Sequence, residues 1–237
     1  MDRHYLQAGA TPEFFYFKAK KKLIEVLLNK VKTVKKGVLL NVGAGTGDDL
    51  SVIKKHGDVV VVDTDKELLA LIPEDEVLQK KQNDLCSLDF PDNCFDLVIA
   101  FDVLEHIEAH QTAIQQVNRV LKRGGYFVFT VPAFQCLYGA HDRALNHYRR
   151  YDKKIIRNLL TDFRCVELGF WMFFLFLPVA LQRWLKRSSL KQKVHFMALP
   201  KVINRVFYLL LAYESSLIKH GISLPVGTTI YGIFQKT

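Results

Sequence analysis

Four short, mostly apolar runs constrain the fold more than any other feature of the sequence. They are Val38–Val42, Asp58–Val62, Phe95–Phe101 and Tyr126–Val131. Each run is too short for an ordinary helix and lacks the alternation of a half-exposed strand, which is typical of strands buried on both faces of a sheet. Helical patterns precede the first run (Tyr16–Val34) and separate the last two (His106–Leu121). Strands alternating with helices predict an α/β fold with a parallel sheet.

The regular alternation ends at Pro132. We expect a loop rich in His, Arg and Tyr over 133–150, and then a helix over Asp152–Thr161 with Asp152 as its N-cap. Further expected elements are a strand over 164–174, two helices within the apolar and basic residues 175–222, and a last strand over 228–236. The 237 residues are enough for one large α/β domain with its own core.

Charge divides the chain into three parts. The net charge of +9 is the sum of +6 over residues 1–40, −8 over 41–135 and +11 over 136–237. Basic ends favour nucleic acid, anionic lipid or a phosphorylated or carboxylated substrate, whereas the acidic middle indicates a different partner. With 49% hydrophobic and 12% aromatic residues and no sustained heptad, the sequence excludes a disordered chain and a coiled coil.

Cysteine spacing and the N-terminal residues predict a cytoplasmic protein. The four cysteines form no C-x-x-C pair, and Met1–Ala10 is polar, unlike a signal peptide. Reduced thiols are therefore expected. The longest uncharged apolar stretch, Leu168–Leu181, has 14 residues and contains Pro178. It is shorter than the about 20 residues that a membrane-spanning helix needs.

A glycine cluster follows the first run directly. Gly43, Gly45 and Gly47 have the spacing G-x-G-x-G, between an expected strand and an expected helix. Glycines let the backbone turn sharply and let a ligand approach the main chain, although a tight turn alone also explains them. Asp63 ends the second run twenty residues after Gly43, where its carboxylate can accept hydrogen bonds from ribose hydroxyls.

These motifs together resemble the class I S-adenosylmethionine-dependent methyltransferases over about residues 37–135. The matching features are the glycine cluster, Asp63, Asp84 before the third run, and the stretch Asp102-Val103-Leu104-Glu105-His106 after it. The resemblance implies a Rossmann-like, doubly wound, mostly parallel seven-stranded sheet with an antiparallel last strand. It also implies a helical C-terminal insertion and S-adenosyl-L-methionine as the cofactor.

The resemblance also assigns residues to the cofactor site. These are Asn41, Gly43, Ala44, Gly45, Asp63, Thr64, Asp84, Leu85, Phe101 and His106. Asn41 departs from the family, which usually has Asp or Glu at this position. An amide oxygen accepts a hydrogen bond from the methionyl ammonium without charge assistance, so we expect weakened or rearranged binding there.

A loop rich in His, Arg and Tyr is expected over the acceptor side. His141 and His147 are the candidate catalytic bases, and Tyr148, Arg149 and Arg150 are the candidate substrate-binding residues for a carboxylate or phosphate. A solvated loop is the alternative. The segment His-Tyr-Arg-Arg-Tyr at 147–151 resembles the H-x-R-R-Y motif of a methyltransferase subgroup associated with surface-polysaccharide or lipid-linked pathways.

Two further segments leave alternatives open. The aromatic residues 14–17 resemble a lid over the cofactor in that subgroup, but they also suit a helix packed on the sheet edge. Asp102, Glu105 and His106 resemble the E-x-x-E-H metal motif of quinone-type O-methyltransferases. Because this stretch is common in members without a metal, no metal is expected.

The apolar and basic segment 169–193 is compatible with peripheral membrane contact, which would place the protein at the inner membrane surface. The alternatives are an apolar lid or a dimer interface. We expect a single methyltransferase domain over 1–237. Its parts are an N-terminal lid or helix (1–36), a cofactor-binding core (37–135), an acceptor loop, helix and strand (136–174), a helical insertion (175–222) and a final strand (223–237).

The predicted function is methyl transfer by in-line displacement to a small-molecule or lipid- or saccharide-linked anionic acceptor. The alternative is a non-catalytic S-adenosylmethionine-binding module that docks on a membrane or protein partner. An NAD or nucleotide-sugar enzyme is disfavoured because the third glycine comes one residue early. Nucleic acid is disfavoured as an acceptor because the chain lacks the motif for exocyclic amines and an aromatic RNA-binding platform.

Overall fold

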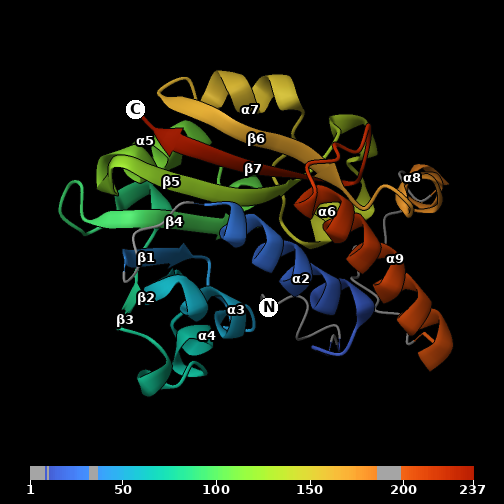
Figure 1. Cartoon of the computed structure of the whole chain (residues 1–237), viewed down its shortest axis with the longest axis horizontal. Helices are drawn as coiled ribbons and strands as arrows, with labels where there is room; N and C mark the ends of the chain where they lie inside the picture. Colours follow the sequence, from blue (N-terminus) through green and yellow to red (C-terminus); the bar gives the residue numbers. More distant parts are fainter. Residues whose placement is uncertain (1–8, 10, 32–36, 186–198) are drawn as a thin grey trace.

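A seven-stranded sheet forms the centre of the computed structural model, which describes residues 9, 11–31, 37–185 and 199–237 (Figure 1). The strands are β1 (Gly37–Val42), β2 (Gly57–Asp63), β3 (Gln79–Gln82), β4 (Phe95–Phe101), β5 (Leu121–Pro132), β6 (Phe163–Trp171) and β7 (Thr229–Lys236). Their order in the sheet is β3-β2-β1-β4-β5-β7-β6. Strands β1 to β5 pair in parallel, and β7 is antiparallel to both neighbours. The predicted mostly parallel sheet with an antiparallel last strand is confirmed.

Helices connect these strands and cover both faces. They are α2 (Phe15–Lys30), α3 (Leu50–Ile53), α4 (Lys66–Ala70), α5 (His110–Val120), α6 (Ala140–Ala144), α7 (Lys153–Leu159), α8 (Phe176–Leu185) and α9 (Lys201–Lys219). Short 3-10 turns are η1 (Lys54–His56), η2 (Glu74–Glu76), η3 (Leu85–Ser87), η4 (Leu104–His106) and η5 (Gln135–Leu137). Helices α8 and α9 lie in the chain between β6 and β7, which is the expected place for a helical insertion in the final hairpin.

Successive residues of the inner strands point to opposite faces and enter two separate cores. Leu39 of β1 packs in the core under α2, α3 and α9, whereas Leu40 packs in the core under α5 and α7. Both side chains are fully buried. This explains why the strands read as continuous apolar runs, because neither face of the sheet meets water.

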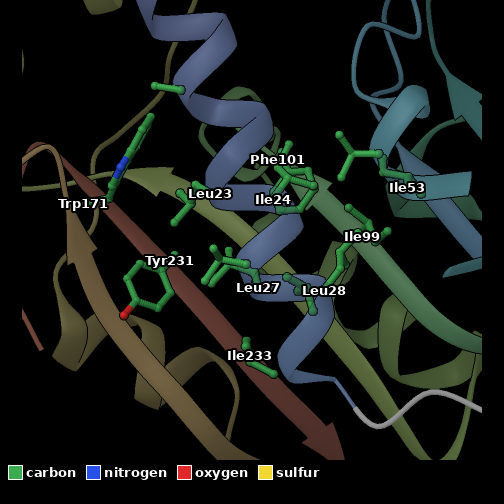
Figure 2. Close-up of a cluster of buried hydrophobic side chains, with 14 of the residues drawn as sticks. Leu23, Ile24, Leu27, Leu28, Ile53, Ile99, Phe101, Trp171, Tyr231 and Ile233 are labelled. Carbon is green, nitrogen blue, oxygen red and sulfur yellow. The ribbon is translucent and has the colours of Figure 1, made fainter. Parts of the chain in front are cut away.

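Helix α2 crosses one face of the sheet and lies beside α9 (Figure 1). Figure 2 shows Leu23, Ile24 and Leu27 of α2 pointing toward side chains of β4 and β7. These three leucine and isoleucine side chains are fully buried, and burial of each contributes roughly 1.5–3 kcal/mol. The predicted N-terminal helix is thus packed on the sheet, and its first turn lies at the carboxyl end of β4.

Several boundaries differ from the sequence expectation. Strand β3 was missed because its sequence, QKKQ, is polar and it lies at the sheet edge. The helix expected over His106–Leu121 begins at His110, after a 3-10 turn. Asp152 caps α7 as expected, since its side chain accepts a hydrogen bond from the Ile155 N–H at 2.7 Å. No helix among the described residues has the length and hydropathy to cross a membrane.

Candidate active site

Three cavities meet at the carboxyl ends of the central strands. A large cavity has a volume of about 480 Å³, a middle cavity about 210 Å³ and a small cavity about 60 Å³. Asp102, the first residue after β4, lines all three. The strand order reverses between β1 and β4, and ligands of open α/β sheets bind at such a point.

The large cavity contains the residues expected to hold the nucleoside. Gly43, Asp63, Thr64, Asp84, Leu85 and His106 line it. Asp63 accepts hydrogen bonds from the Gly45 N–H at 2.7 Å and the Asp65 N–H at 2.9 Å, one on each carboxylate oxygen. Each oxygen can accept a further hydrogen bond. Asp63 therefore fixes the glycine loop and retains acceptor capacity toward the cavity.

Gly43 makes the turn at the end of β1 possible. Its φ of +64° lies in the left-handed region, and a Cβ there would come within 2.5 Å of Cγ2 of Val103. Both the backbone conformation and the close approach of the loop after β4 require glycine. The loop lies between the large and small cavities, and its part in cofactor binding stays a prediction.

The small cavity contains the remaining predicted cofactor residues of β1 and β4 together with side chains of α2. Its wall consists of Tyr16, Phe17, Lys20, Asn41, Gly43, Ala44, Asp48, Asp49, Phe101 and Asp102. Asn41 is buried there, 5% exposed. Three carboxylates, those of Asp48, Asp49 and Asp102, share this wall with Lys20, so the wall carries a net negative charge although position 41 does not.

Lys20 enters the small cavity from α2 and pairs with Asp102. The Lys20 Nζ lies 2.7 Å from the Asp102 Oδ2. Burial disfavours the charged form of Lys20, but the carboxylates of Asp102 and Asp49 outweigh it and raise the pKa of Lys20. Burial likewise acts against the Asp102 carboxylate, and Lys20 outweighs it, so the pKa of Asp102 is lowered. Both groups are therefore charged at neutral pH.

The backbone of Asp102 is held in an unusual conformation. Its φ is +57°, which a residue other than glycine rarely adopts. The Asp102 N–H donates to the Thr130 carbonyl at 3.0 Å, and the Thr130 hydroxyl donates to Oδ1 at 2.8 Å. The Tyr16 hydroxyl donates to Oδ2 at 3.1 Å. Such strain persists at functional sites when the surroundings fix it, and here β5 and α2 fix it.

The middle cavity receives both candidate catalytic histidines. Its lining residues are Phe14, Phe15, Tyr16, Asp102, Glu105, His106, Pro132, His141, Leu145, His147, Arg150, Met172, Val179, Arg183, Thr228 and Thr229. Burial and the positive charge of Arg183 lower the pKa of His141 to about 3, so this imidazole is neutral. The expected acceptor side and the histidines thus lie across Asp102 from the large cavity.

Asp142 organises the polar wall of the middle cavity. It is fully buried and accepts hydrogen bonds from Arg150 Nε at 2.8 Å and Arg183 Nη1 at 3.1 Å, and it lies 3.2 Å from His147 Nδ1. Burial alone would raise the pKa of Asp142, but His147, Arg150 and Arg183 hold it well below its usual range. A permanent carboxylate therefore orients the His147 ring.

The three predicted substrate-binding residues lie in different surroundings. Arg150 lines the middle cavity, but its guanidinium is buried and bonded to Asp142 and to the Ala133 carbonyl. Tyr148 lines the large cavity. Arg149 donates to the Glu108 carbonyl at 2.8 Å. The loop therefore brings Arg150 together with His141 and His147, and it does not bring Tyr148 and Arg149 to the same cavity.

Sequence reasoning missed three residues of this site. Lys20 interrupts the apolar stripe of α2, between Tyr16 and Leu23 on the same helix face, and that interruption is the signal that could have found it. Arg183 belongs to α8 and Thr130 to β5. No local pattern relates these two residues to Asp142 and Asp102, because only the tertiary fold brings them together.

Glu105 is a buried carboxyl at the junction of the cavities. It is 1% exposed, and its Oε2 has no hydrogen-bond partner among the described residues. Burial, reinforced by the negative charge of Asp102, raises the pKa of Glu105 well above its ordinary value. The sequence grouped Asp102, Glu105 and His106 as an alternative metal motif, but the carboxylate of Asp102 is bonded to Lys20, Tyr16 and Thr130.

Comparison with known proteins supports this description of the core. Residues 40–129 match the family described as Methyltransferase domain. An uncharacterized methyltransferase of Schizosaccharomyces pombe is 36% identical over 103 residues, which are 37% of this chain and 37% of that protein. Phosphatidylethanolamine N-methyltransferase of Cereibacter sphaeroides is 31% identical over 99 residues, 39% of this chain and 49% of that protein. The matches span less than half the length of these two relatives.

Solved structures share the whole fold. An S-adenosylmethionine-dependent methyltransferase of Archaeoglobus fulgidus has a TM-score of 0.59 and 16% identity, with 99% of this chain and 100% of that chain covered. The sheet order and the cavities at its switch point define the class I methyltransferase fold. Residues 40–129 are thus similar in sequence to methyltransferases, and the described chain has the fold of S-adenosylmethionine-dependent methyltransferases; S-adenosylmethionine is the cofactor that this similarity implies.

Proposed function

We propose that the whole protein transfers a methyl group from S-adenosylmethionine to an anionic, lipid-linked acceptor at a membrane surface. One observation carries this proposal: α8 separates the middle cavity from an exposed apolar surface. Val179 and Arg183 of α8 line the cavity. The outer side of the same helix exposes Leu177, Leu181, Trp184 and Leu185, each more than half exposed.

We assign the three cavities to three parts of the reaction. The nucleoside occupies the large cavity, and the methionyl group occupies the small one. The acceptor enters the middle cavity, so that the methyl group passes near Asp102, where the cavities meet. This arrangement suits an in-line displacement, in which positioning supplies much of the rate enhancement. Tyr16 and Lys20 make the first turns of α2 a lid over the cofactor.

The charged wall of the middle cavity suits an acceptor that must lose a proton. His147 is the proposed base, because the Asp142 carboxylate on its Nδ1 directs Nε2 away from that carboxylate. His141 provides a neutral imidazole beside it. Arg183 places a positive charge in the same wall, which favours an anionic group on the acceptor.

A second exposed apolar stripe lies on α9. Val202, Val206, Leu209 and Tyr213 recur at helical spacing on its outer side, each between 47% and 74% exposed. Contiguous exposed apolar surface marks an interaction site, and a helix with basic flanks suits an anionic membrane surface. Lys201 and Arg205 on α9 are exposed cations. The further basic residues predicted for the membrane segment, up to residue 193, lie outside the described residues.

A relative of known acceptor class supports this choice. The matched phosphatidylethanolamine N-methyltransferase bears the name of a phospholipid acceptor. We further propose that the protein belongs to the methyltransferase subgroup with the H-x-R-R-Y segment, which is associated with lipid- or saccharide-linked acceptors. The alternative of a non-catalytic binding module has no support from the comparisons, since the matched relatives are named as methyltransferases.

The experiment combines flotation with transfer of label. Vesicles containing anionic phospholipid should carry the wild-type protein upward, and incubation with methyl-labelled S-adenosylmethionine and a membrane lipid extract should place label in the organic phase. Leu181→Asp with Trp184→Asp should abolish both. Leu71→Asp is the matched control, because Leu71 is 61% exposed at a distant site before β3. Protein that stays at the bottom at every salt concentration would refute the membrane proposal.

A further inference from the structure

Three metal-binding side chains converge in the middle cavity. Glu105 and His106 belong to the turn η4 after β4, and His147 comes from the loop before α7. Their potential ligand atoms all lie within 4.8 Å of one another. The two imidazole rings are 4.6 Å apart between centroids and nearly perpendicular. Residues about forty positions apart in the chain are thus brought to one point of the cavity wall.

The environment of Glu105 provides an independent indication of a ligand. Glu105 is 1% exposed, and its Oε2 finds no hydrogen-bond partner among the described residues. An unpaired buried carboxylate is costly and is usually neutralised or bound to a cation. The cationic side chains whose charge acts on Glu105 are already bonded to other carboxylates: Lys20 to Asp102, and Arg150 to Asp142.

The orientation of His147 also suits a metal ligand. Its Nδ1 lies 3.2 Å from Asp142, which the two arginines keep as a carboxylate. A carboxylate only accepts hydrogen bonds, so Nδ1 carries the hydrogen, and Nε2 is the nitrogen with the lone pair in the neutral ring. Metal-binding histidines usually donate their second ring N–H to a carboxylate in this way. Asp142 therefore sets the ring in the form that binds a cation.

We propose that Glu105, His106 and His147 bind a divalent cation of the zinc class in the middle cavity. Two imidazoles and one carboxylate form the ligand set of many catalytic zinc sites, with the fourth position open. Magnesium prefers an all-oxygen set. Ligand atoms around tetrahedral zinc lie about 3.3 Å apart. Because the three present ligand atoms lie within 4.8 Å of one another, they need to approach by at most about 1.5 Å when the ion binds.

The charged side chains around this site give the cation a role in the proposed methyl transfer. Lys20 is paired with Asp102, and Arg150 and Arg183 share the Asp142 carboxylate. A divalent cation bound to Glu105 adds positive charge to this cluster, and its open position accepts an oxygen or nitrogen atom of an anionic acceptor. With the cation bound, His147 is a ligand rather than a base, and the cation makes the acceptor atom more acidic. This role of the cation in acceptor chemistry rests on the proposed function, whereas the binding of the cation does not.

The experiment measures metal binding directly. Chelator-treated protein is titrated with zinc, manganese or magnesium chloride by calorimetry, and its metal content is measured after dialysis. We expect one zinc ion per chain, weaker manganese binding and no saturable magnesium binding. Glu105→Gln and His147→Asn should each weaken zinc binding by at least about 10-fold. Cobalt should give visible absorption that these variants lose.

Controls keep the outcome interpretable. His110→Gln changes a half-buried histidine bonded to Tyr151 outside the cluster and should leave zinc affinity unchanged. Should Glu105→Gln fail to fold, His106→Asn tests the same site at a less buried ligand. Equal zinc affinity in wild type and folded variants, or no stoichiometric zinc, would overturn the proposal. Binding of S-adenosylmethionine and vesicle flotation need no cation, so their failure is distinguishable from this one.

Discussion

The Nζ of Lys20 lies 2.7 Å from the Asp102 carboxylate, which joins the N-terminal helix to the end of β4. Lys20 is 12% exposed and Asp102 25% exposed. Because Asp102 lines all three cavities, this ion pair connects α2, the proposed lid, with the place where we propose that methyl donor and acceptor meet.

Removing one partner of this pair should be strongly destabilising. Lys20→Met leaves the largely buried Asp102 carboxylate without its cation, so we expect the free energy of unfolding in urea titrations to fall by about 3 kcal/mol. Adding Asp102→Asn should recover part of this loss. Lys22→Met is the control on the same helix, because Lys22 is 47% exposed and its pair with Glu25 contributes under about 1 kcal/mol. Equal effects of the two lysine substitutions would contradict this assignment.

Asp63 should be indispensable for cofactor binding. Asp63→Ala removes the acceptor for the ribose hydroxyls and the anchor of the Gly45 N–H. Two hydrogen bonds to a charged group contribute about 3 kcal/mol, so calorimetry should show at least about 100-fold weaker binding of S-adenosylhomocysteine. Asp58→Ala, at the exposed beginning of the same strand, should bind normally. Unchanged affinity of Asp63→Ala for S-adenosylhomocysteine would contradict the placement of the nucleoside in the large cavity.

Gly43→Ala separates backbone strain from steric overlap. Gly221 has φ +81° with open space around it, whereas Gly43 has φ +64°, and a Cβ at Gly43 would lie 2.5 Å from Cγ2 of Val103. Gly221→Ala should therefore cost only about 1 kcal/mol of stability for the left-handed conformation. Gly43→Ala should cost more in thermal unfolding and also lose cofactor affinity, and Val103→Ala should relieve part of the loss. Equal losses of stability in both alanine variants would contradict a steric overlap between Val103 and a Cβ at position 43.

His141 should make folding sensitive to mild acid in metal-free protein. Its pKa falls from 6.5 to about 3 on folding because of burial and Arg183, with Arg150 and His147 acting in the same direction and Asp142 opposing. Between these values the unfolded chain binds a proton that the folded chain does not, so stability decreases as the pH falls below about 6.5. By pH 5 the loss is about 2 kcal/mol. In urea titrations, His141→Gln should lack this decrease of stability between pH 6.5 and 5. His220→Gln, on the surface after α9, should retain it.

The strands of the core could be predicted from sequence because each is buried on both faces. Val59 and Val61 face one core and Val60 and Val62 the other, which leaves no polar position in the run. β3 offers no such pattern, since its four residues are polar and none is buried. Its pairing with β2 comes from the topology, as residues after α4 return to the free edge.

The residues of the large cavity could be predicted further than those of the middle cavity. Asp63 and Gly43 lie in motifs that one strand and its following turn define locally. The middle cavity depends instead on Asp142, which binds Arg150 from its own loop and Arg183 from α8, 41 residues away. The sequence pattern predicted Arg150 as a substrate-binding side chain. No local pattern shows that the buried Asp142 carboxylate is bonded to its guanidinium.

Calorimetry of the folded wild-type chain with S-adenosylhomocysteine and NAD tests the central claim most directly. The three cavities that meet at Asp102 predict one saturable site for S-adenosylhomocysteine and no heat with NAD. A folded sample that releases no heat with S-adenosylhomocysteine, or that binds NAD instead, would contradict the assignment of this site to an S-adenosylmethionine-dependent methyltransferase.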